Sequence, residues 1–164
     1  MVLTFALSNV LREDIGELMK IAPDLLVDVL KAHPALRCIY KKIGAATHGT
    51  RVVKVKIYNP AGLTIYSSDP TQIGEDKSAN EGFLSGIGNI VVSTLTYRDQ
   101  FDTFEKTIFK RDLISSYNPV FEAGVSQSPS GVFEIYSDVT ALKSTISNRV
   151  WLILGATIGI LLAV

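Results

Sequence analysis

The last fifteen residues of the chain, Val150–Val164, contain no charge and almost no polar side chain. A helix needs about 20 apolar residues to cross the hydrocarbon core of a bilayer. The run therefore predicts the beginning of a transmembrane helix that the sequence truncates. Residues 1–149 contain charges, turn signals and alternating strand patterns, and about 150 residues are enough for one domain with its own core. We expect a folded domain followed by a membrane anchor.

The charge balance and the scarcity of metal-binding side chains argue against several functions. Lysine plus arginine equals aspartate plus glutamate, at 16 each, so we expect no nucleic-acid partner. The single cysteine, Cys38, and the two histidines, His33 and His48, form no metal-ligand spacing. No nucleophile elbow is recognisable. We therefore expect no metal, no cofactor and no enzymatic activity.

Residues 10–46 have a helical pattern, with apolar side chains recurring at spacings of three and four. Pro23 and Pro34 fall inside this pattern, and each is expected to restart the helix. Gly44 is the expected stop. The segment Met1–Leu11 is apolar but has no positive flank. It is either the end of an upstream transmembrane helix or the start of a soluble one.

The pattern changes to period two after residue 48. Valine and isoleucine alternate with Lys54 and Lys56, which predicts a strand with one buried face and both lysines in water. The Asn59–Gly62 tetrapeptide (N-P-A-G) is a strong turn signal, and a hairpin is expected there. Later strands are expected at Leu63–Ser67, Ile90–Thr96, Leu113–Phe121 and Gly131–Ser137.

Three segments between the strands carry further predictions. Ser68–Gly82 is polar and long for a connection, which is typical of functional or mobile loops; its carboxylates bind a cation or remain solvated. Glu81–Ile87 is predicted to be a short helix. Tyr97–Asp112 is either a hairpin extension or a short helix. Pro119 donates no ladder hydrogen bond, so its strand is expected to bend there or lie at an edge.

Asp138-Val139-Thr140 ends the last predicted strand and precedes a run that leads into the apolar tail. An aspartate or threonine here caps the first N–H groups of a helix. A simple cap is one interpretation. The position between a sheet and a membrane helix favours a second one, in which Asp138 and Thr140 transmit a signal from the sheet to the helix.

Several motifs together resemble a known family. The N-P-A-G hairpin, the loop S-S-D-P-T-Q-I-G-E-D and the closing G-V-F-E-I-Y-S-D-V-T before a membrane helix are similar to extracytoplasmic PAS-like (Cache-type) sensor domains of bacterial membrane receptors, of the histidine kinase or diguanylate cyclase type. The resemblance covers Val52–Thr140. It implies an α+β fold, with a five-stranded antiparallel PAS-like sheet, a long N-terminal helical segment on one face and a pocket under the central loop. The expected division is helical segment 1–48, sensor core 49–140, juxtamembrane helix 141–149 and transmembrane start 150–164.

The same resemblance suggests a ligand site formed by Tyr66, Arg98, Tyr117 and Tyr136. The planar fork of arginine suits a carboxylate or another anion, and tyrosine offers a hydroxyl on an apolar body. Core packing remains the alternative for each tyrosine. For Arg98 the alternative is a solvated charge in a turn.

Gly155 and Gly159 stand four residues apart in the apolar tail, a spacing that lets two membrane helices approach closely. This spacing favours a homodimer in the lipid bilayer. We expect an extracytoplasmic (periplasmic) sensory input domain at the cell membrane. It responds to a small-molecule ligand or to a changed membrane or ionic condition, and it passes the signal to a cytoplasmic output module. The alternative is a membrane-anchored binding or assembly module without signalling output.

Overall fold

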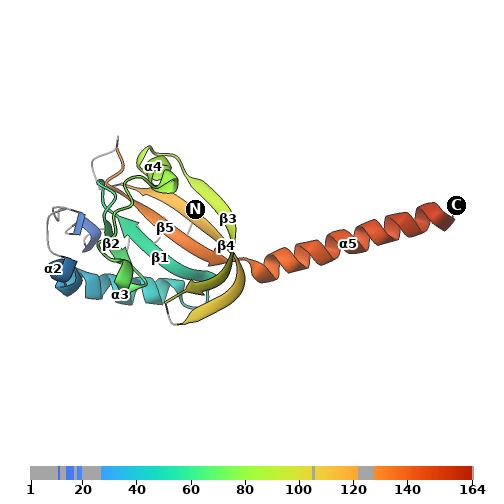
Figure 1. Cartoon of the computed structure of the whole chain (residues 1–164), viewed down its shortest axis with the longest axis horizontal. Helices are drawn as coiled ribbons and strands as arrows, with labels where there is room; N and C mark the ends of the chain where they lie inside the picture. The colour runs from blue at the N-terminus through green and yellow to red at the C-terminus, as the bar shows by residue number, and fades with distance from the viewer. Residues whose placement is uncertain are drawn as a thin grey trace.

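The computed structural model of the chain describes residues 11, 14–16, 18–19, 27–104, 106–121 and 128–163. A folded domain carries one long helix that projects away from it (Figure 1). The predictions for Met1–Val10 and Pro23 lie outside the described residues. The elements, in chain order, are α2 (Val27–Ala32), α3 (Pro34–Thr47), β1 (Val52–Tyr58), β2 (Thr64–Ser67), the 3₁₀ turn η1 (Pro70–Gln72), α4 (Glu81–Ile87), β3 (Val92–Asp102), β4 (Thr107–Val120), β5 (Gly131–Asp138) and α5 (Thr140–Ala163).

The five strands form one antiparallel sheet in the order β2-β1-β5-β4-β3, which confirms the predicted α+β fold. The first hairpin turns at the predicted tetrapeptide, where the Asn59 side chain accepts hydrogen bonds from the N–H groups of Ala61 and Leu63. Gly62 has a φ of 86° there, a conformation that glycine adopts without strain.

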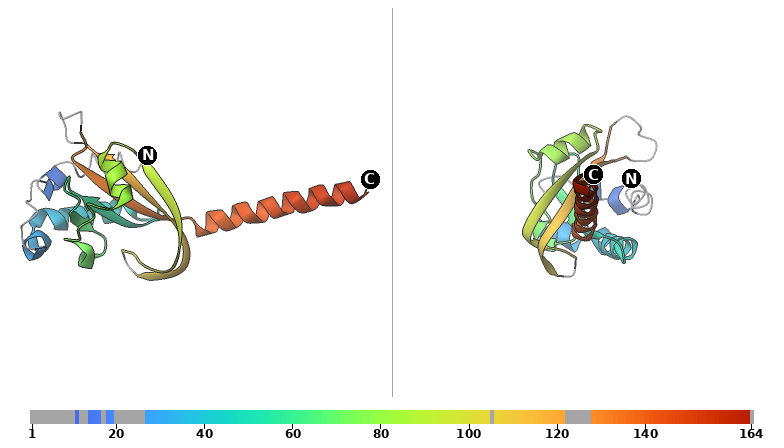
Figure 2. Two further views of the ribbon diagram at one scale, coloured as in Figure 1. Left: turned by 45° about the horizontal axis from the view of Figure 1, so that its top comes forward. Right: turned by 90° about the vertical axis from the view of Figure 1, so that its right-hand side faces the viewer.

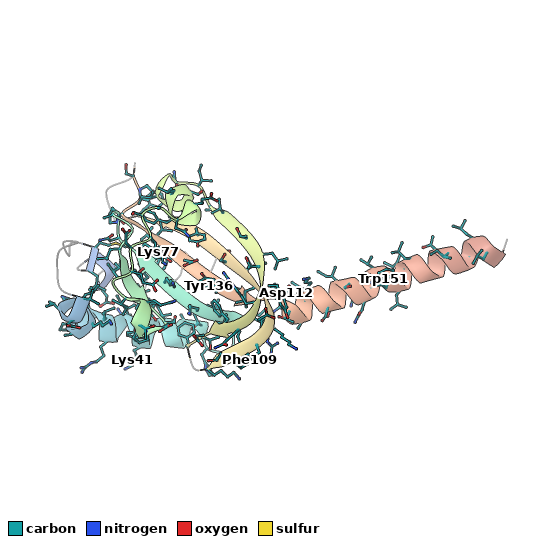
Figure 3. The ribbon with its side chains drawn as sticks, viewed as in Figure 1. Lys41, Lys77, Phe109, Asp112, Tyr136 and Trp151 are labelled. Atoms are coloured by element: carbon teal, nitrogen blue, oxygen red, sulfur yellow. The ribbon has the colours of Figure 1, made fainter. Side chains whose placement is uncertain are left out.

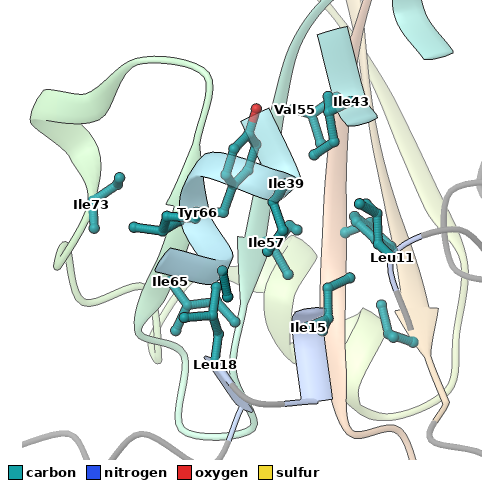
Figure 4. Packing of buried hydrophobic residues seen from close by; sticks show 14 of the residues in the cluster. Leu11, Ile15, Leu18, Ile39, Ile43, Val55, Ile57, Ile65, Tyr66 and Ile73 are labelled. Carbon is teal, nitrogen blue, oxygen red and sulfur yellow. The ribbon is translucent and has the colours of Figure 1, made fainter. Parts of the chain in front are cut away.

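Helix α3 covers one face of the sheet and defines the main core (Figure 4). Ile39 and Ile43 of α3 pack with Val55, Ile57 and Phe133 of the central strands, and all five are fully buried. The helix and the sheet both present apolar residues here, and this explains why they pack together. Burial of each large apolar side chain contributes about 1.5–3 kcal/mol to the stability of the fold.

The ends of α3 are set by capping. His33 accepts a hydrogen bond from the N–H of Ala35, and Pro34 occupies the first turn, so the helix restarts at this proline as predicted. The predicted stop at Gly44 is wrong, because α3 continues to Thr47. Gly49, with a φ of 71°, provides the left-handed residue that ends the segment.

The segment that the sequence left undecided, Tyr97–Asp112, is an extension of the β3–β4 hairpin. Arg98 pairs with Arg111 and Gln100 pairs with Phe109, but the intervening pair is missing from the ladder. Lys110 has a φ of 52° at this point, and the far end of the hairpin curls round (Figure 2) until the N–H of Phe104 reaches the carbonyl of Val53 in β1.

Strand β4, which contains Pro119, lies between β5 and β3, so the predicted position of this strand at an edge is wrong; the proline itself lies beyond the part of β4 that pairs with β3. The pairing of β3 with β4 begins at Val92 and Tyr117, so β4 has no β3 partner at the proline. On its other side Pro119 lies opposite Val132 of β5. The missing N–H of proline therefore costs the sheet no ladder bond on the open side.

Helix α5 is continuous from Thr140 to Ala163, so the predicted juxtamembrane and apolar parts form a single helix. Its segment Thr140–Leu162 is long and apolar enough to cross a membrane, and none of that segment's apolar window is buried against the domain. Gly155 and Gly159 have open space where a Cβ would lie.

Candidate functional site

The face of the sheet opposite α3 holds buried charges. We call Lys54, Lys56, Tyr58, Tyr117, Glu134 and Tyr136 the Glu134 cluster. Glu134 is 2% exposed, Lys54 3% and Lys56 5%. The prediction that both lysines face water is therefore wrong: this face of β1 is covered as thoroughly as the other.

The carboxylate of Glu134 is the centre of the cluster, opposite Lys56 of β1 and Tyr117 of β4 in the sheet register. Its Oε2 accepts a hydrogen bond from the Tyr58 hydroxyl. Its buried Oε1 accepts none from the described residues. Burial raises the pKa of the Tyr58, Tyr117 and Tyr136 phenols, and the charge of Glu134 raises each of them further. The phenols therefore remain protonated donors around the carboxylate.

The two lysines are held by acidic residues of the polar loop. The Lys54 ammonium lies 3.8 Å from a carboxylate oxygen of Asp69 and 3.3 Å from Oε1 of Gln72. Lys56 lies 3.7 Å from a carboxylate oxygen of Glu75. Burial lowers the pKa of Lys54, and the charge of Asp69 opposes that change. The long polar loop thus supplies counter-charges to the cluster.

Helix α4 covers one end of this face, and two glycines allow its close approach. A Cβ on Gly82 would lie 2.2 Å from the ring of Tyr117, and one on Gly86 would lie 2.7 Å from Val132. Phe83 of α4 packs edge-on against Tyr58, with ring centroids 5.9 Å apart. The helix therefore fixes the position of two phenols of the cluster.

The β3–β4 hairpin reaches the other end of the face. The ring centroids of Phe101 and Tyr136 lie 4.9 Å apart. The Lys54 ammonium lies 4.6 Å from the centroid of the Phe101 ring. A cleft of about 370 Å³ lies between the hairpin and the start of the polar loop, with Asp69 and Asp102 among its lining residues.

The structure brings some of the predicted ligand residues together and separates others. Tyr117 and Tyr136 both lie at Glu134. Arg98 is exposed, but its positive charge reaches both phenols and opposes the rise in their pKa that burial causes. Tyr66 lies on the opposite face, in the core beside Tyr40, with ring centroids 4.8 Å apart.

Sequence reasoning missed Lys54, Lys56, Tyr58 and Glu134. Glu134 did leave a signal, because it stands in the middle of the otherwise apolar strand G-V-F-E-I-Y-S. Lys54 and Lys56 left none, since alternation of lysine with valine is also the pattern of an ordinary half-exposed strand.

The predicted Asp138-Val139-Thr140 step joins the sheet to α5 (Figure 3). Oδ1 of Asp138 accepts from the N–H of Thr140 at 2.9 Å, so the predicted cap is confirmed. The N–H of Asp112 donates to Oγ1 of Thr140 at 3.0 Å, and the Lys143 ammonium lies 2.6 Å from Oδ1 of Asp112. We call Asp112, Asp138, Thr140 and Lys143 the α5 clamp.

Comparison with known proteins finds likeness in fold. No protein-family model matches the chain, and no curated protein matches it. Among solved structures, the DcuS sensor domain of E. coli is 12% identical with a TM-score of 0.49, over 87% of this chain and 91% of that one. The sensor domain of the V. cholerae histidine kinase DctB is 17% identical with a TM-score of 0.48, over 73% of this chain and 45% of that one.

The periplasmic domain of RsbU from Chlamydia trachomatis is 18% identical with a TM-score of 0.46, over 68% of this chain and 37% of that one. The chain thus spans less than half the length of the DctB and RsbU chains. Two of these structures are sensor domains, and the third is a periplasmic domain. At such identities the likeness concerns the fold alone.

Proposed function

We propose that the chain is the extracytoplasmic sensory input domain of a membrane-bound signal-transduction receptor. A small molecule binds at the Glu134 cluster, and the change passes through Asp138-Val139-Thr140 into α5 and on to a cytoplasmic output module. One observation carries this proposal: strand β5 holds the buried Glu134 and, four residues later, the Asp138 cap of α5.

The chemistry of the cluster supports a binding role. Burying a charge costs several kcal/mol unless it is well paired, and apolar residues in the same positions are often more stabilising. Charges arranged in this way are typical of functional sites. The buried Oε1 of Glu134 has no hydrogen-bond partner among the described residues, and in this proposal it accepts from a donor of the ligand. The phenols of Tyr117 and Tyr136 interact with the same carboxylate.

Transmission requires two arrangements of the sheet that bind the ligand with different affinity. The α5 clamp supplies the mechanical link, because both β4 and β5 hold the first turn of the helix. We propose further that α5 lies in the lipid bilayer and pairs with a second copy through the face of Gly155 and Gly159, which stands open.

A ligand screen tests the proposal. Thermal unfolding of the full chain in lipid nanodiscs is measured with carboxylates, amino acids, amines and divalent ions. A ligand at 100 times its dissociation constant adds about 2.7 kcal/mol to the free energy of unfolding. We expect at least one compound to raise the midpoint in the wild type and not in Glu134→Gln.

Tyr66→Phe, on the opposite face, is the matched control and is expected to respond like the wild type. The absence of any stabilising compound, or an equal response from Glu134→Gln, contradicts a ligand site at this cluster. A compound that binds without any change in α5 favours the membrane-anchored binding module.

The orientation of the domain has its own test, because Cys38 is the chain's single cysteine and is exposed. A membrane-impermeant maleimide applied to intact spheroplasts is expected to label Cys38. Labelling only after lysis places the domain in the cytoplasm and overturns the proposed location.

A further inference from the structure

The β3–β4 hairpin bends sharply at one residue pair. Asp99 and Lys110 are missing from a ladder that otherwise keeps its register. Lys110 has a φ of 52°, a left-handed conformation that a lysine adopts only when its surroundings impose it. We call residues 99–104 and 106–110 the hairpin end. The bend turns the hairpin end back toward the Glu134 face.

The hairpin end lies across the site and is held there by a few contacts. Phe101 packs on Tyr136 and lies under the Lys54 ammonium. The N–H of Phe104 donates to the carbonyl of Val53 at 3.2 Å. The cleft of about 370 Å³ separates it from residues 68–71. Phe104 also packs beside the main core. Strand β4 pairs with β5 only from Leu113 onward, so the hairpin end is not part of the ladder with β5 and opens more readily than the rest of the sheet.

The bend and the α5 clamp are neighbours in the chain. Two residues after Lys110, Asp112 holds both Thr140 and Lys143, and its carbonyl accepts from the N–H of Val139 at 2.9 Å. Between them, Arg111 lies 3.7 Å from the carboxylate of Asp138. A rotation of the backbone at Lys110 therefore shifts groups that hold the first turn of α5.

We propose that the hairpin end is a lid over Lys54 and Tyr136, and that its opening is coupled through Arg111 and Asp112 to the first turn of α5. The proposed function gives this lid its purpose, since a ligand reaches the cluster when the lid opens and holds it closed once bound. The motion itself belongs to the ligand-free protein, so it is testable without a ligand.

The test of the lid is the acetylation rate of Lys54 by an N-hydroxysuccinimide ester, read by mass spectrometry on the full chain in nanodiscs. Phe101→Ala removes the ring contacts of the lid with Tyr136 and Lys54 and is expected to raise this rate about fivefold. Phe109→Ala is the matched control, because Phe109 lies on the same hairpin and is 60% exposed. Equal Lys54 rates in Phe101→Ala and the wild type overturn the lid.

The test of the coupling uses the reciprocity of linked equilibria. Thr140→Val keeps the shape of the side chain but removes the acceptor for the Asp112 N–H, and we expect Lys54 acetylation to rise about fivefold. Ser144→Ala is the control, since its hydroxyl bonds only within α5. An unchanged rate in Thr140→Val overturns the coupling even where Phe101→Ala confirms the lid.

The thermal midpoint of every variant is measured alongside, so that a faster reaction is compared among folded proteins. The acetylation rate of Lys41, which is exposed on α3 outside the lid, reports general loosening and is expected to stay constant. A parallel rise at Lys41 in Thr140→Val contradicts a specific path from α5 to the lid. Failure of the ligand screen leaves these results unaffected, so the two proposals fail separately.

Discussion

The two faces of the sheet are both buried, but one is apolar and the other is charged. Adjacent residues of β5 show the contrast. Phe133 points into the core under α3, among fully buried aliphatic side chains. Glu134 points to the other face, among the buried Lys54, Lys56 and Tyr58 and the half-buried Tyr117 and Tyr136. The first face lowers the free energy of the folded state by apolar burial. The second works against it, since buried charges are desolvated.

The contrast between the two faces indicates which substitutions are expected to change stability and which are expected to change binding. Under the proposed function the buried, charged face is retained for what it binds, whereas the buried, apolar face is sufficient for folding. This comparison predicts that truncation of a buried apolar side chain on the α3 face changes stability strongly. Substitutions on the Glu134 face are expected to change it less, or in the opposite direction, while they alter binding.

The largest effect is expected from Phe133→Ala. Removing a fully buried phenyl ring costs about 3–5 kcal/mol, to be measured by urea unfolding of the full chain in detergent. Leu95→Ala, at an exposed strand position, is the control and is expected to stay near zero. A loss of less than about 1 kcal/mol in the free energy of unfolding for Phe133→Ala contradicts this contrast, because the α3 face is then not the main source of stability.

The next largest effect comes from deleting one tyrosine hydroxyl on each face and comparing the two changes in the free energy of unfolding. Tyr58→Phe removes the hydrogen bond to the buried carboxylate of Glu134 and is expected to cost about 1.5–3 kcal/mol. Tyr66→Phe removes a hydroxyl that has no hydrogen-bond partner among the described residues, and a change within about 0.5 kcal/mol is expected. The same unfolding measurement decides, and equal losses contradict the assignment of the charged network to one face.

A pair of glycines tests the packing of α4. Gly82→Ala places a methyl group against the Tyr117 ring and is expected to cost about 1–3 kcal/mol by overpacking. Gly44→Ala in α3 meets open space, so the better helix propensity of alanine is expected to add about 0.5–1 kcal/mol. Stabilisation by both substitutions shows that α4 does not rest on Tyr117.

The smallest effect concerns pH. Lys54 has a lowered pKa in the folded protein and its usual value of 10.5 when unfolded. The unfolded chain therefore binds more protons between these two values, and the contribution of Lys54 to stability rises with pH there. Lys54→Met is expected to raise the free energy of unfolding by on the order of 1 kcal/mol at pH 7. This gain in stability is expected to shrink as the pH rises toward 10.5. A gain that grows with pH in thermal unfolding contradicts the burial of a charged Lys54.

Local signals in the sequence predicted the parts of the fold that local physics decides. Pro34 restarts a helix because its ring fixes φ, and Asn59 with Gly62 makes a turn because the amide side chain and a positive φ build one. The closing Asp138-Val139-Thr140 step predicted its own cap. The Tyr97–Asp112 segment stayed undecided, because charges interrupt its apolar pattern and the bend depends on contacts with distant strands.

The candidate site was less accessible to sequence reasoning. The burial of Lys54 depends on Asp69 and Phe101, which come from other parts of the chain, so a strand pattern read alone placed it in water. Tyr66 and Tyr136 look alike in sequence, and only the register of the strands sends one into the core and the other to Glu134.

Hydrogen–deuterium exchange on the full chain in nanodiscs tests whether ligand binding on the Glu134 face changes the first turn of α5. It compares the ligand-free protein with the protein bound to the most stabilising compound of the screen. We predict slower exchange in the hairpin end and altered exchange in the first turn of α5, from Thr140 to Ser144, with α3 unchanged. Protection confined to α3, with no difference in the hairpin end and α5, contradicts a sensor site on the Glu134 face.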